Sequence, residues 1–169
     1  MTFIIRRVLM FLKKVVHKST SSLINNNFKN PKVNNNINSQ IIIKPLKKIH
    51  LEDGDVLHAL KASEVEFNGF EEAYFSTIKK NKLKAWKRHM RMTMNLIVPV
   101  GEVKFNFYDN KKMLLKTKII GEDNYSRITV PPMIWFGFKG LSTYTSYILN
   151  ISDESHDPSE VERKPVSYL

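Results

Sequence analysis

One short stretch of the sequence, Lys84 to Asp109, combines residues that could do chemistry with a spacing that would gather them on one surface. A histidine titrates near neutral pH and can move a proton, while lysine and arginine can stabilise a developing negative charge or hold a phosphate. In an extended strand alternate side chains share a face, and the alternate positions here carry Lys87, His89, Arg91, Thr93 and Asn95. The pattern predicts a polar, cationic concavity containing His89. A structural histidine beside two solvated cations would give the same pattern.

The second half of this stretch has the pattern of a half-buried strand that would pack beside the first. Its apolar and polar residues alternate from Val103 to Tyr108, as expected for a strand with one face on the core. Between the halves, Pro99-Val100-Gly101-Glu102 contains the residues of a turn. The stretch therefore predicts a hairpin, one arm of which lines the concavity.

The rest of the chain from Ile41 onward indicates more strands of the same kind. Short apolar and β-branched runs recur about every 8–12 residues with turn residues between them, which is typical of an all-β sandwich or barrel. In the run Glu66 to Ser76, the side chains of Phe70, Glu72 and Tyr74 share one face. Further runs are expected at 41–43, 114–120, 127–130, 135–138 and 144–151.

Charge is distributed very unevenly along the 169 residues. Residues 1–51 carry ten Lys or Arg and no Asp or Glu, whereas residues 52–169 carry 17 basic and 16 acidic residues, within a total net charge of +11. Because the folded part is nearly neutral, the charge does not indicate a nucleic-acid partner. The sequence has no cysteine, which excludes disulfides, thiolate nucleophiles and cysteine-based metal sites.

These patterns divide the chain into a basic, Asn-rich extension, residues 1–40, and one folded domain, residues 41–169. Residues 1–20 could form a basic amphipathic helix, as in an organelle presequence or an interfacial helix, or could be an extension without function. Residues 21–40 are Asn-rich and indicate a disordered linker. We expect a cytoplasmic protein, or alternatively a mitochondrial one, with membrane contact only through residues 1–20.

Four segments, in this order, resemble the nucleotide-sugar epimerases of the cupin superfamily, specifically the dTDP-4-dehydrorhamnose 3,5-epimerase family. They are Phe67-Asn68-Gly69-Phe70-Glu71-Glu72, Trp86-Lys87-Arg88-His89, Pro99-Val100-Gly101-Glu102-Val103, and Val130-Pro131-Pro132 continuing through Gly137-Phe138 to Leu141-Ser142. Asp157-Pro158-Ser159-Glu160 is similar to the segment that closes that fold. The resemblance covers roughly Ile42 to Glu162 and implies a cupin jelly-roll β-sandwich, usually dimeric, with the ligand inside the barrel.

The resemblance also implies an activity: epimerisation of a nucleotide-linked 4-keto-6-deoxy sugar in deoxysugar (dTDP-rhamnose) biosynthesis, without a cofactor. In that family the histidine at the position of His89 removes a proton beside the sugar ketone. Such a reaction needs a base that titrates near the working pH and a cation where the enolate oxygen develops. We therefore expect His89 and Lys87 to be catalytic, with the substrate bound by Arg91, Asn95, Glu72, Asn150 and Trp86.

The sequence differs from the family pattern at several functional positions. Trp86 stands where the epimerases have an arginine, and Phe136 replaces a histidine. The family's acid, a tyrosine, falls on Asn150, so proton exchange is expected to outrun net epimerisation. The carboxylate partner of His89 is unassigned, with Asp157 and Asp153 as candidates. Three alternatives stay open: a one-centre epimerase, a sugar 3,4-ketoisomerase, to which 131–135 is also similar, and a non-catalytic sugar-binding cupin.

A metal-dependent cupin would need two histidines one residue apart, a carboxylate and a later histidine. The matching positions read His89-Met90-Arg91, which places a cation where a ligand should be. The sequence therefore predicts no metal site.

Overall fold

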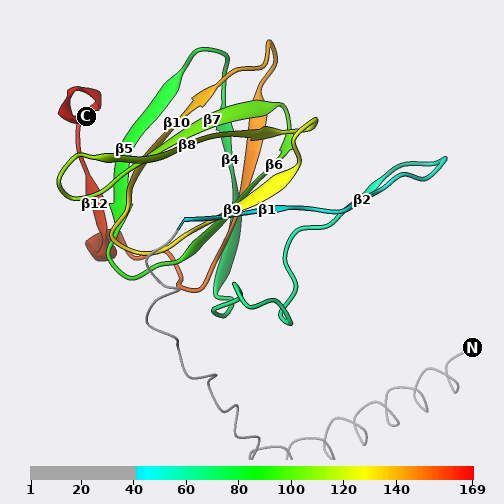
Figure 1. Ribbon diagram of the computed structural model, residues 1–169, viewed down its shortest axis with the longest axis horizontal. Coiled ribbons are helices and arrows are strands. Elements are labelled where there is room, and N and C mark those ends of the chain that lie inside the picture. Colours follow the sequence, from blue (N-terminus) through cyan, green and yellow to red (C-terminus); the bar gives the residue numbers. More distant parts are fainter. Residues whose placement is uncertain (1–40) are drawn as a thin grey trace, which may run out of the picture. The chain divides into compact units, whose positions relative to one another are not determined.

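The computed structural model describes residues 41–169, and almost every regular element in them is a β-strand (Figure 1). The amphipathic helix and the linker predicted for residues 1–40 lie outside the described residues. The strands are β1 (Ile42–Pro45), β2 (Lys48–Ile49), β3 (Val56–Leu57), β4 (Glu72–Ile78), β5 (Leu83–His89), β6 (Met94–Val100), β7 (Glu102–Tyr108), β8 (Leu114–Gly121), β9 (Ser126–Val130), β10 (Trp135–Gly140), β11 (Ser146–Ser152) and β12 (Val161–Arg163). Two short 3₁₀ helices, η1 (Pro158–Glu160) and η2 (Val166–Tyr168), flank β12.

Ten of these strands form two five-stranded antiparallel sheets, which we call sheet A and sheet C. Sheet A has the order β1-β9-β6-β11-β4, and sheet C has the order β12-β5-β10-β7-β8. Their inner faces share one apolar core, to which sheet A contributes Met94, Leu96, Val98, Ile128, Val130 and Ile148 and sheet C contributes Val103, Phe105, Phe107, Ile120 and Phe136. The alternation seen in the sequence of β7 is the alternation of core and outer positions. The predicted all-β jelly-roll class is confirmed.

The hairpin predicted for Lys84 to Asp109 is wrong, although its turn exists. Gly101 has a φ of +82°, which glycine adopts without a steric penalty, and the chain reverses there between β6 and β7. However, β6 pairs with β9 and β11 in sheet A, whereas β7 pairs with β10 and β8 in sheet C. The turn is therefore a corner between the two sheets. Period-2 patterning cannot distinguish such a corner from a hairpin, because each strand buries one face in either case.

The first arm of that predicted hairpin is also two strands. β5 ends at His89 and β6 begins at Met94, in the other sheet. Because a short turn joins β4 to β5, the beginning of β4 and the end of β5 lie at the same end of the sandwich. β11 is antiparallel to β4 and pairs Ser152 with Glu72, so its last residues are at that end too. Three strands thus bring their inward-facing polar residues to one end of the core.

The two-stranded hairpin β2–β3 lies outside both sheets and extends away from them (cyan to teal in Figure 1). Its side chains Val56 and Leu57, and Leu51 at its turn, are exposed. Within residues 41–169 no helix has the length and apolar character needed to cross a lipid bilayer.

Candidate active site

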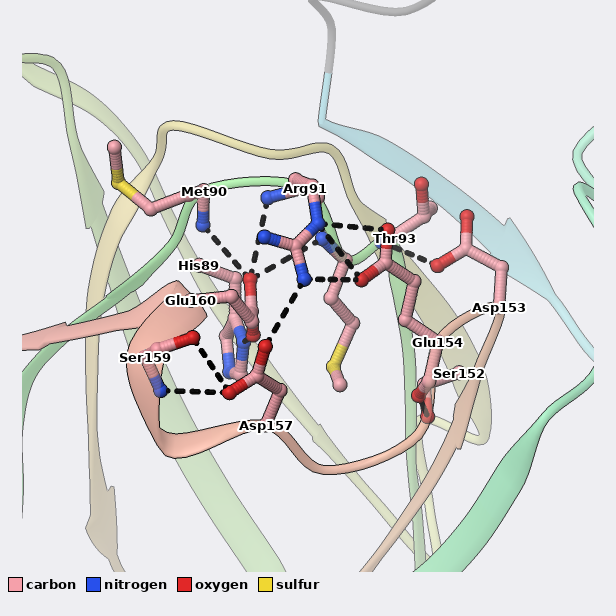
Figure 2. A network of polar contacts seen from close by, with 11 residues as sticks. His89, Met90, Arg91, Thr93, Ser152, Asp153, Glu154, Asp157, Ser159 and Glu160 are labelled. Carbon is pink, nitrogen blue, oxygen red and sulfur yellow. Dashed lines mark hydrogen bonds and ion pairs between the residues drawn. The ribbon is translucent and has the colours of Figure 1, made fainter.

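His89, at the end of β5, is buried and paired with an equally buried carboxylate. Its side chain is 2% exposed, and its ring Nδ1 contacts Oε1 of Glu160, which is fully covered. The second oxygen of Glu160 accepts the backbone N–H groups of Met90 at 3.0 Å and Arg91 at 3.2 Å (Figure 2). A carboxylate that accepts several hydrogen bonds is stabilised as the anion. Glu160 is therefore held in one orientation by the loop that follows His89.

The sequence around Glu160 explains why this carboxylate turns inward. Asp157 caps the 3₁₀ helix η1 by accepting the backbone N–H of Ser159 at 2.8 Å, and Pro158 takes the first helical position. Both are common at helix starts, because the cap satisfies an orphan N–H and proline lacks one. The chain then enters β12, which pairs Val161 with His89. This register brings Glu160 against the imidazole.

The pair defines the proton state of the histidine. Burial would raise the pKa of Glu160, but the hydrogen bonds from His89 and from backbone amides outweigh it and hold that pKa below 4.5. Burial lowers the pKa of His89 below 6.5; the hydrogen bond to Glu160 opposes this, and the charge of Lys87 adds to it. A neutral imidazole beside an anionic carboxylate donates its Nδ1–H and keeps a lone pair on Nε2. His89 Nε2 is buried and has no hydrogen-bond partner among residues 41–169, so it is free to accept a proton from a ligand.

Lys87 lies two residues before His89 on the inner face of β5, as its parity predicts. Its ammonium lies 5.5 Å from the ring centre of Phe136, and that ring also stacks on His89 with a centroid separation of 6.3 Å. Burial lowers the pKa of Lys87 below 10.5, and the positive charge of Arg163 lowers it further. Lys87 makes no ion pair within the described part of the chain. An unpaired cation beside a base is suited to an anionic oxygen of a ligand.

The opposite wall is formed by β4 and β11 of sheet A. Asn150 is 2% exposed, and neither its Oδ1 nor its Nδ2 has a hydrogen-bond partner in residues 41–169. Glu72 is half-buried, and its Oε2 is likewise buried and unpartnered there. Buried polar atoms without partners are rare in folded proteins, because each costs desolvation free energy. Both predicted substrate-binding residues are thus where a polar ligand could satisfy them.

Arg91 does not project into the barrel, which corrects the prediction from strand parity. Its side chain is 54% exposed and lies between the carboxylates of Glu154 and Asp157, outside the site (Figure 2). The reason is that β5 ends at His89, so the alternation of an extended strand does not continue to Arg91. Its role in the described structure is to tie the loop after β11 to the loop after β5.

Two further candidates also lie outside the barrel. Trp86 packs on the outer face of sheet C, edge-to-face with Tyr108 at 5.1 Å, and its indole N–H donates to the carbonyl of Val166 at 3.1 Å. Gly137 permits this packing, because a Cβ there would lie 2.9 Å from the indole ring. Trp86 has the opposite parity to His89, so alternation alone excludes it from the inner face.

Asn95 is the other candidate that points away from the core. Its amide donates to the carbonyl of Ile151 at 3.2 Å and its Oδ1 accepts the hydroxyl of Thr129 at 2.8 Å. Its neighbours Met94 and Leu96 face the core instead. Asn95 therefore stabilises sheet A and is not available to a ligand inside the barrel.

Sequence reasoning missed two residues of the site. Glu160 is the carboxylate that contacts His89. Of the two candidates predicted for that place, Asp157 caps η1 instead. The other, Asp153, accepts the backbone N–H of Thr93 at 2.7 Å. Tyr74, on the inner face of β4, is the register partner of Asn150. Its parity with Glu72 was the signal that could have found it.

The arrangement is suited to accepting a proton from a ligand. Among residues 41–169 no three His, Asp or Glu side chains lie close enough to hold a metal ion. A buried neutral histidine oriented by a carboxylate is a general base, and Lys87 can stabilise the anion that forms. The site can therefore take a proton from a ligand and stabilise the negative charge that develops on it.

Comparisons with known proteins give the family of this site. Neither a protein-family model nor a curated protein matches the chain. Among solved structures, it is similar to a dTDP sugar isomerase from Desulfovibrio desulfuricans G20, with 33% identity, a TM-score of 0.71, and coverage of 76% of this chain and 85% of the other.

Two more distant structures share the fold. A sugar 3,4-ketoisomerase from Thermoanaerobacterium thermosaccharolyticum, solved with TDP, is 17% identical with a TM-score of 0.64 and covers 76% of this chain and 90% of the other. A dTDP-4-dehydrorhamnose 3,5-epimerase from Sulfolobus tokodaii is 16% identical with a TM-score of 0.67 and covers 76% and 79%. The expected resemblance is confirmed: the chain belongs to the dTDP-sugar isomerase family of cupin nucleotide-sugar epimerases, and it is an enzyme of the isomerase class.

Proposed function

We propose that this isomerase acts on a nucleotide-linked 4-keto-6-deoxy sugar and that His89 removes the proton from the carbon beside the ketone. The observation that carries the proposal is the buried pair of His89 and Glu160, with Nε2 of His89 unpartnered among the described residues. The dTDP-sugar isomerase that is 33% identical supports a dTDP-linked substrate. A step in dTDP-rhamnose biosynthesis is the finer assignment that we propose.

The chemistry follows from the charges around the base. His89 takes the proton at Nε2, Glu160 stabilises the imidazolium that forms, and Lys87 lies where it can stabilise the enolate oxygen. Glu72 and Asn150 offer hydrogen bonds to the sugar from the other wall. The reaction needs no metal or organic cofactor, because each step is a proton transfer between the substrate and side chains of the site.

The test is solvent exchange with a defined substrate. TDP-4-keto-6-deoxyglucose is incubated with the enzyme in deuterated water, and deuterium is located by NMR at the two carbons beside the ketone. We expect incorporation with wild type and none with His89→Gln, whose fold is checked by its melting temperature. If wild type incorporates no deuterium, the enzymatic proposal is wrong and a sugar-binding cupin is the better description.

The same experiment distinguishes three candidate reactions. Deuterium at both carbons beside the ketone, with an unchanged ketone position, indicates a 3,5-epimerase. Deuterium at one carbon indicates a one-centre epimerase if the ketone stays in place, and a 3,4-ketoisomerase if the ketone moves. The ketoisomerase is retained as second candidate because Phe136 replaces a histidine of the epimerases while the 17% identical neighbour is a ketoisomerase.

We also propose that the enzyme is a homodimer. The outer face of β4 and β11 carries the exposed side chains Phe75 and Tyr147, 61% and 43% exposed, and the β2–β3 hairpin exposes Val56 and Leu57. Exposed apolar patches of this kind mark contact surfaces, and a two-stranded hairpin gains stability when it packs on something. Light scattering should give twice the chain mass for wild type and the chain mass for Phe75→Lys.

A further inference from the structure

We propose that Tyr74 on β4 is the catalytic acid of the reaction, donating a proton to the face of the sugar opposite His89, and that Asn150 positions its phenol. This inference rests on the proposed function. It replaces the expectation that the reaction lacks an acid because Asn150 stands where the related epimerases have a tyrosine. The phenol would come from the neighbouring strand instead.

The register of sheet A places Tyr74 directly beside Asn150. β4 and β11 are antiparallel, and Asn150 is the partner of Tyr74 in the ladder. Side chains of directly opposed residues share a face, with Cβ atoms about 4.5–5.5 Å apart. The exposure of β4 alternates, with Ala73 and Phe75 exposed and Tyr74 half-buried, so Tyr74 points inward together with Asn150. A tyrosine on either strand would therefore reach the same region between the two sheets.

Tyr74 and His89 belong to opposite sheets, and both lie on inward-facing positions of their strands. Glu160 and Arg163 lie close enough for their charges to act on the Tyr74 hydroxyl, and the same two residues act on His89 and Lys87. Tyr74 comes from sheet A. His89 and Lys87 come from β5 of sheet C, and Glu160 and Arg163 come from the closing segment, residues 158–163, which forms η1 and the edge strand β12. Packed sheets are about 10 Å apart, so one sugar ring between them would present opposite faces to His89 and Tyr74.

The phenol is in the right proton state to be a donor. Burial raises the pKa of Tyr74 above its ordinary value of 10.0, and the charges of Glu72 and Glu160 add to this, while the amide of Asn150 acts in the opposite direction. Asn150 thus lies near the Tyr74 hydroxyl, but neither polar atom of its side chain makes a hydrogen bond within residues 41–169. When a ligand fills the site, the amide can accept the phenol O–H or donate to the phenolate.

The step removes one proton from the substrate and returns one proton to it. His89 takes one proton from the carbon beside the ketone, and the enolate takes one proton from the Tyr74 hydroxyl on its other face, which inverts that carbon. The enzyme is left with an imidazolium and a phenolate, and both are reset by proton exchange with water. Where Tyr74 does not donate, the imidazolium returns a proton to the original face, which exchanges hydrogen without inversion.

The deciding variant is Tyr74→Phe, which removes one oxygen and keeps the packing. With TDP-4-keto-6-deoxyglucose in deuterated water, we expect net conversion to fall about 10²- to 10⁴-fold, the contribution of a general acid, while deuterium exchange beside the ketone stays close to wild type. Tyr144→Phe is the matched control, because Tyr144 is exposed and its hydroxyl donates to Glu122 at 3.1 Å, away from the site. It should change neither rate.

Asn150→Ala tests the positioning role through the ratio of conversion to exchange. We expect this ratio to fall in the single variant, and to show no further fall when Asn150→Ala is added to Tyr74→Phe, because residues that act through one group are not additive. A lower ratio in both backgrounds would overturn the positioning role.

Other outcomes overturn the role of Tyr74 itself. Unchanged conversion in Tyr74→Phe would show that it is not the acid. Equal loss of exchange and conversion, in a variant with wild-type melting temperature, would assign Tyr74 to binding or to proton removal. If wild type shows no exchange at all, the proposed function has failed, and the inference about Tyr74 fails with it.

Discussion

Glu160 contacts the imidazole of His89 across 71 positions of the sequence. The same carboxylate accepts the backbone N–H groups of Met90 and Arg91, so it fixes both the ring and the loop that follows it. The environment of the proposed base therefore depends both on β5 and on the segment that closes the fold. The tautomer, the orientation and the pKa of the His89 imidazole are all influenced by this contact.

Replacing Glu160 by Gln should weaken the base more than it weakens the fold. Without the anion, the imidazolium is no longer stabilised, so we expect exchange beside the ketone to fall about 10²-fold or more and the acid limb of the rate profile to move to lower pH. The loss of charge-assisted hydrogen bonds should cost on the order of 2 kcal/mol in the free energy of unfolding.

The matched control for that variant is Glu162→Gln. Glu162 lies two residues further along and pairs with Arg88 at 2.7 Å on the other face of β12. The Glu162→Gln enzyme should exchange deuterium at the wild-type rate, and the acid limb of its pH–rate profile should be that of wild type. A Glu160→Gln enzyme with an unshifted acid limb would show that the carboxylate does not tune His89.

The rate of exchange should depend on pH through two limbs. Because the pKa of His89 is lowered, the neutral base persists below pH 6.5, and activity should fall only at more acid pH. Because the pKa of Lys87 is lowered, activity should decline before pH 10.5 as the cation is lost. The measurement is the pH profile of kcat/KM for exchange. An acid limb above pH 6.5 would contradict the buried neutral histidine.

The same shifts predict how stability depends on pH. Glu160 has a lowered pKa in the folded state, so its contribution to stability is present above pH 4.5 and is lost as pH falls through the folded pKa. His89 has the same sign: the unfolded chain binds more protons below pH 6.5, so acid also favours unfolding there. Melting temperatures of wild type and Glu160→Gln between pH 3 and 7 should therefore converge at low pH.

Lys87→Met should slow exchange by roughly 10²-fold or more, the cost of one oxyanion donor, and should remove the alkaline limb. Methionine fills a similar space beside Phe136 and relieves the burial of a charge, so the melting temperature should not fall. Lys84→Met, on the same strand but exposed and bonded to the carbonyl of Thr77 at 2.8 Å, is the control and should have wild-type kinetics. Equal kinetics for both variants would exclude Lys87 from the chemistry.

Residues 1–40 should be dispensable for folding and for the reaction. The basic residues and the Asn-rich composition of the extension predict no contribution to the core, so a chain beginning at Ile41 should keep the melting temperature and exchange rate of the full protein. A large drop in either would place the domain boundary elsewhere. Residues 1–40 fused to a fluorescent protein would show whether they direct it to mitochondria or leave it in the cytoplasm.

How far the sequence predicts this site can be judged from three residues. The parity of Lys87 and His89 was right because both belong to one strand. The same rule failed at Arg91 because no local signal marks where β5 stops. β5 ends where the amides of 90 and 91 turn onto the carboxylate of Glu160, which is a long-range contact. The strand pattern and the fold class are local properties, whereas the partner of the base is not.

Tyr74 and Trp86 illustrate the other limit. Trp86 is an aromatic residue beside the base in the sequence, but it lies on the other side of sheet C. Tyr74 is 15 positions before His89 in the sequence. Only the pairing of β4 with β11 places it beside Asn150. Matching position by position to a family pattern therefore shows that an acid is missing, but not that a neighbouring strand carries one.

The closing segment also sets when activity can arise during folding. Every strand of sheet A and the four other strands of sheet C precede Glu160 in the chain, so the two sheets can pair before β12 docks on β5. Until β12 docks, His89 has no carboxylate partner and the loop after it is unanchored. A chain can thus have paired sheets and still be unable to take a proton from a sugar, and the appearance of exchange activity during refolding would mark the moment the closing segment docks.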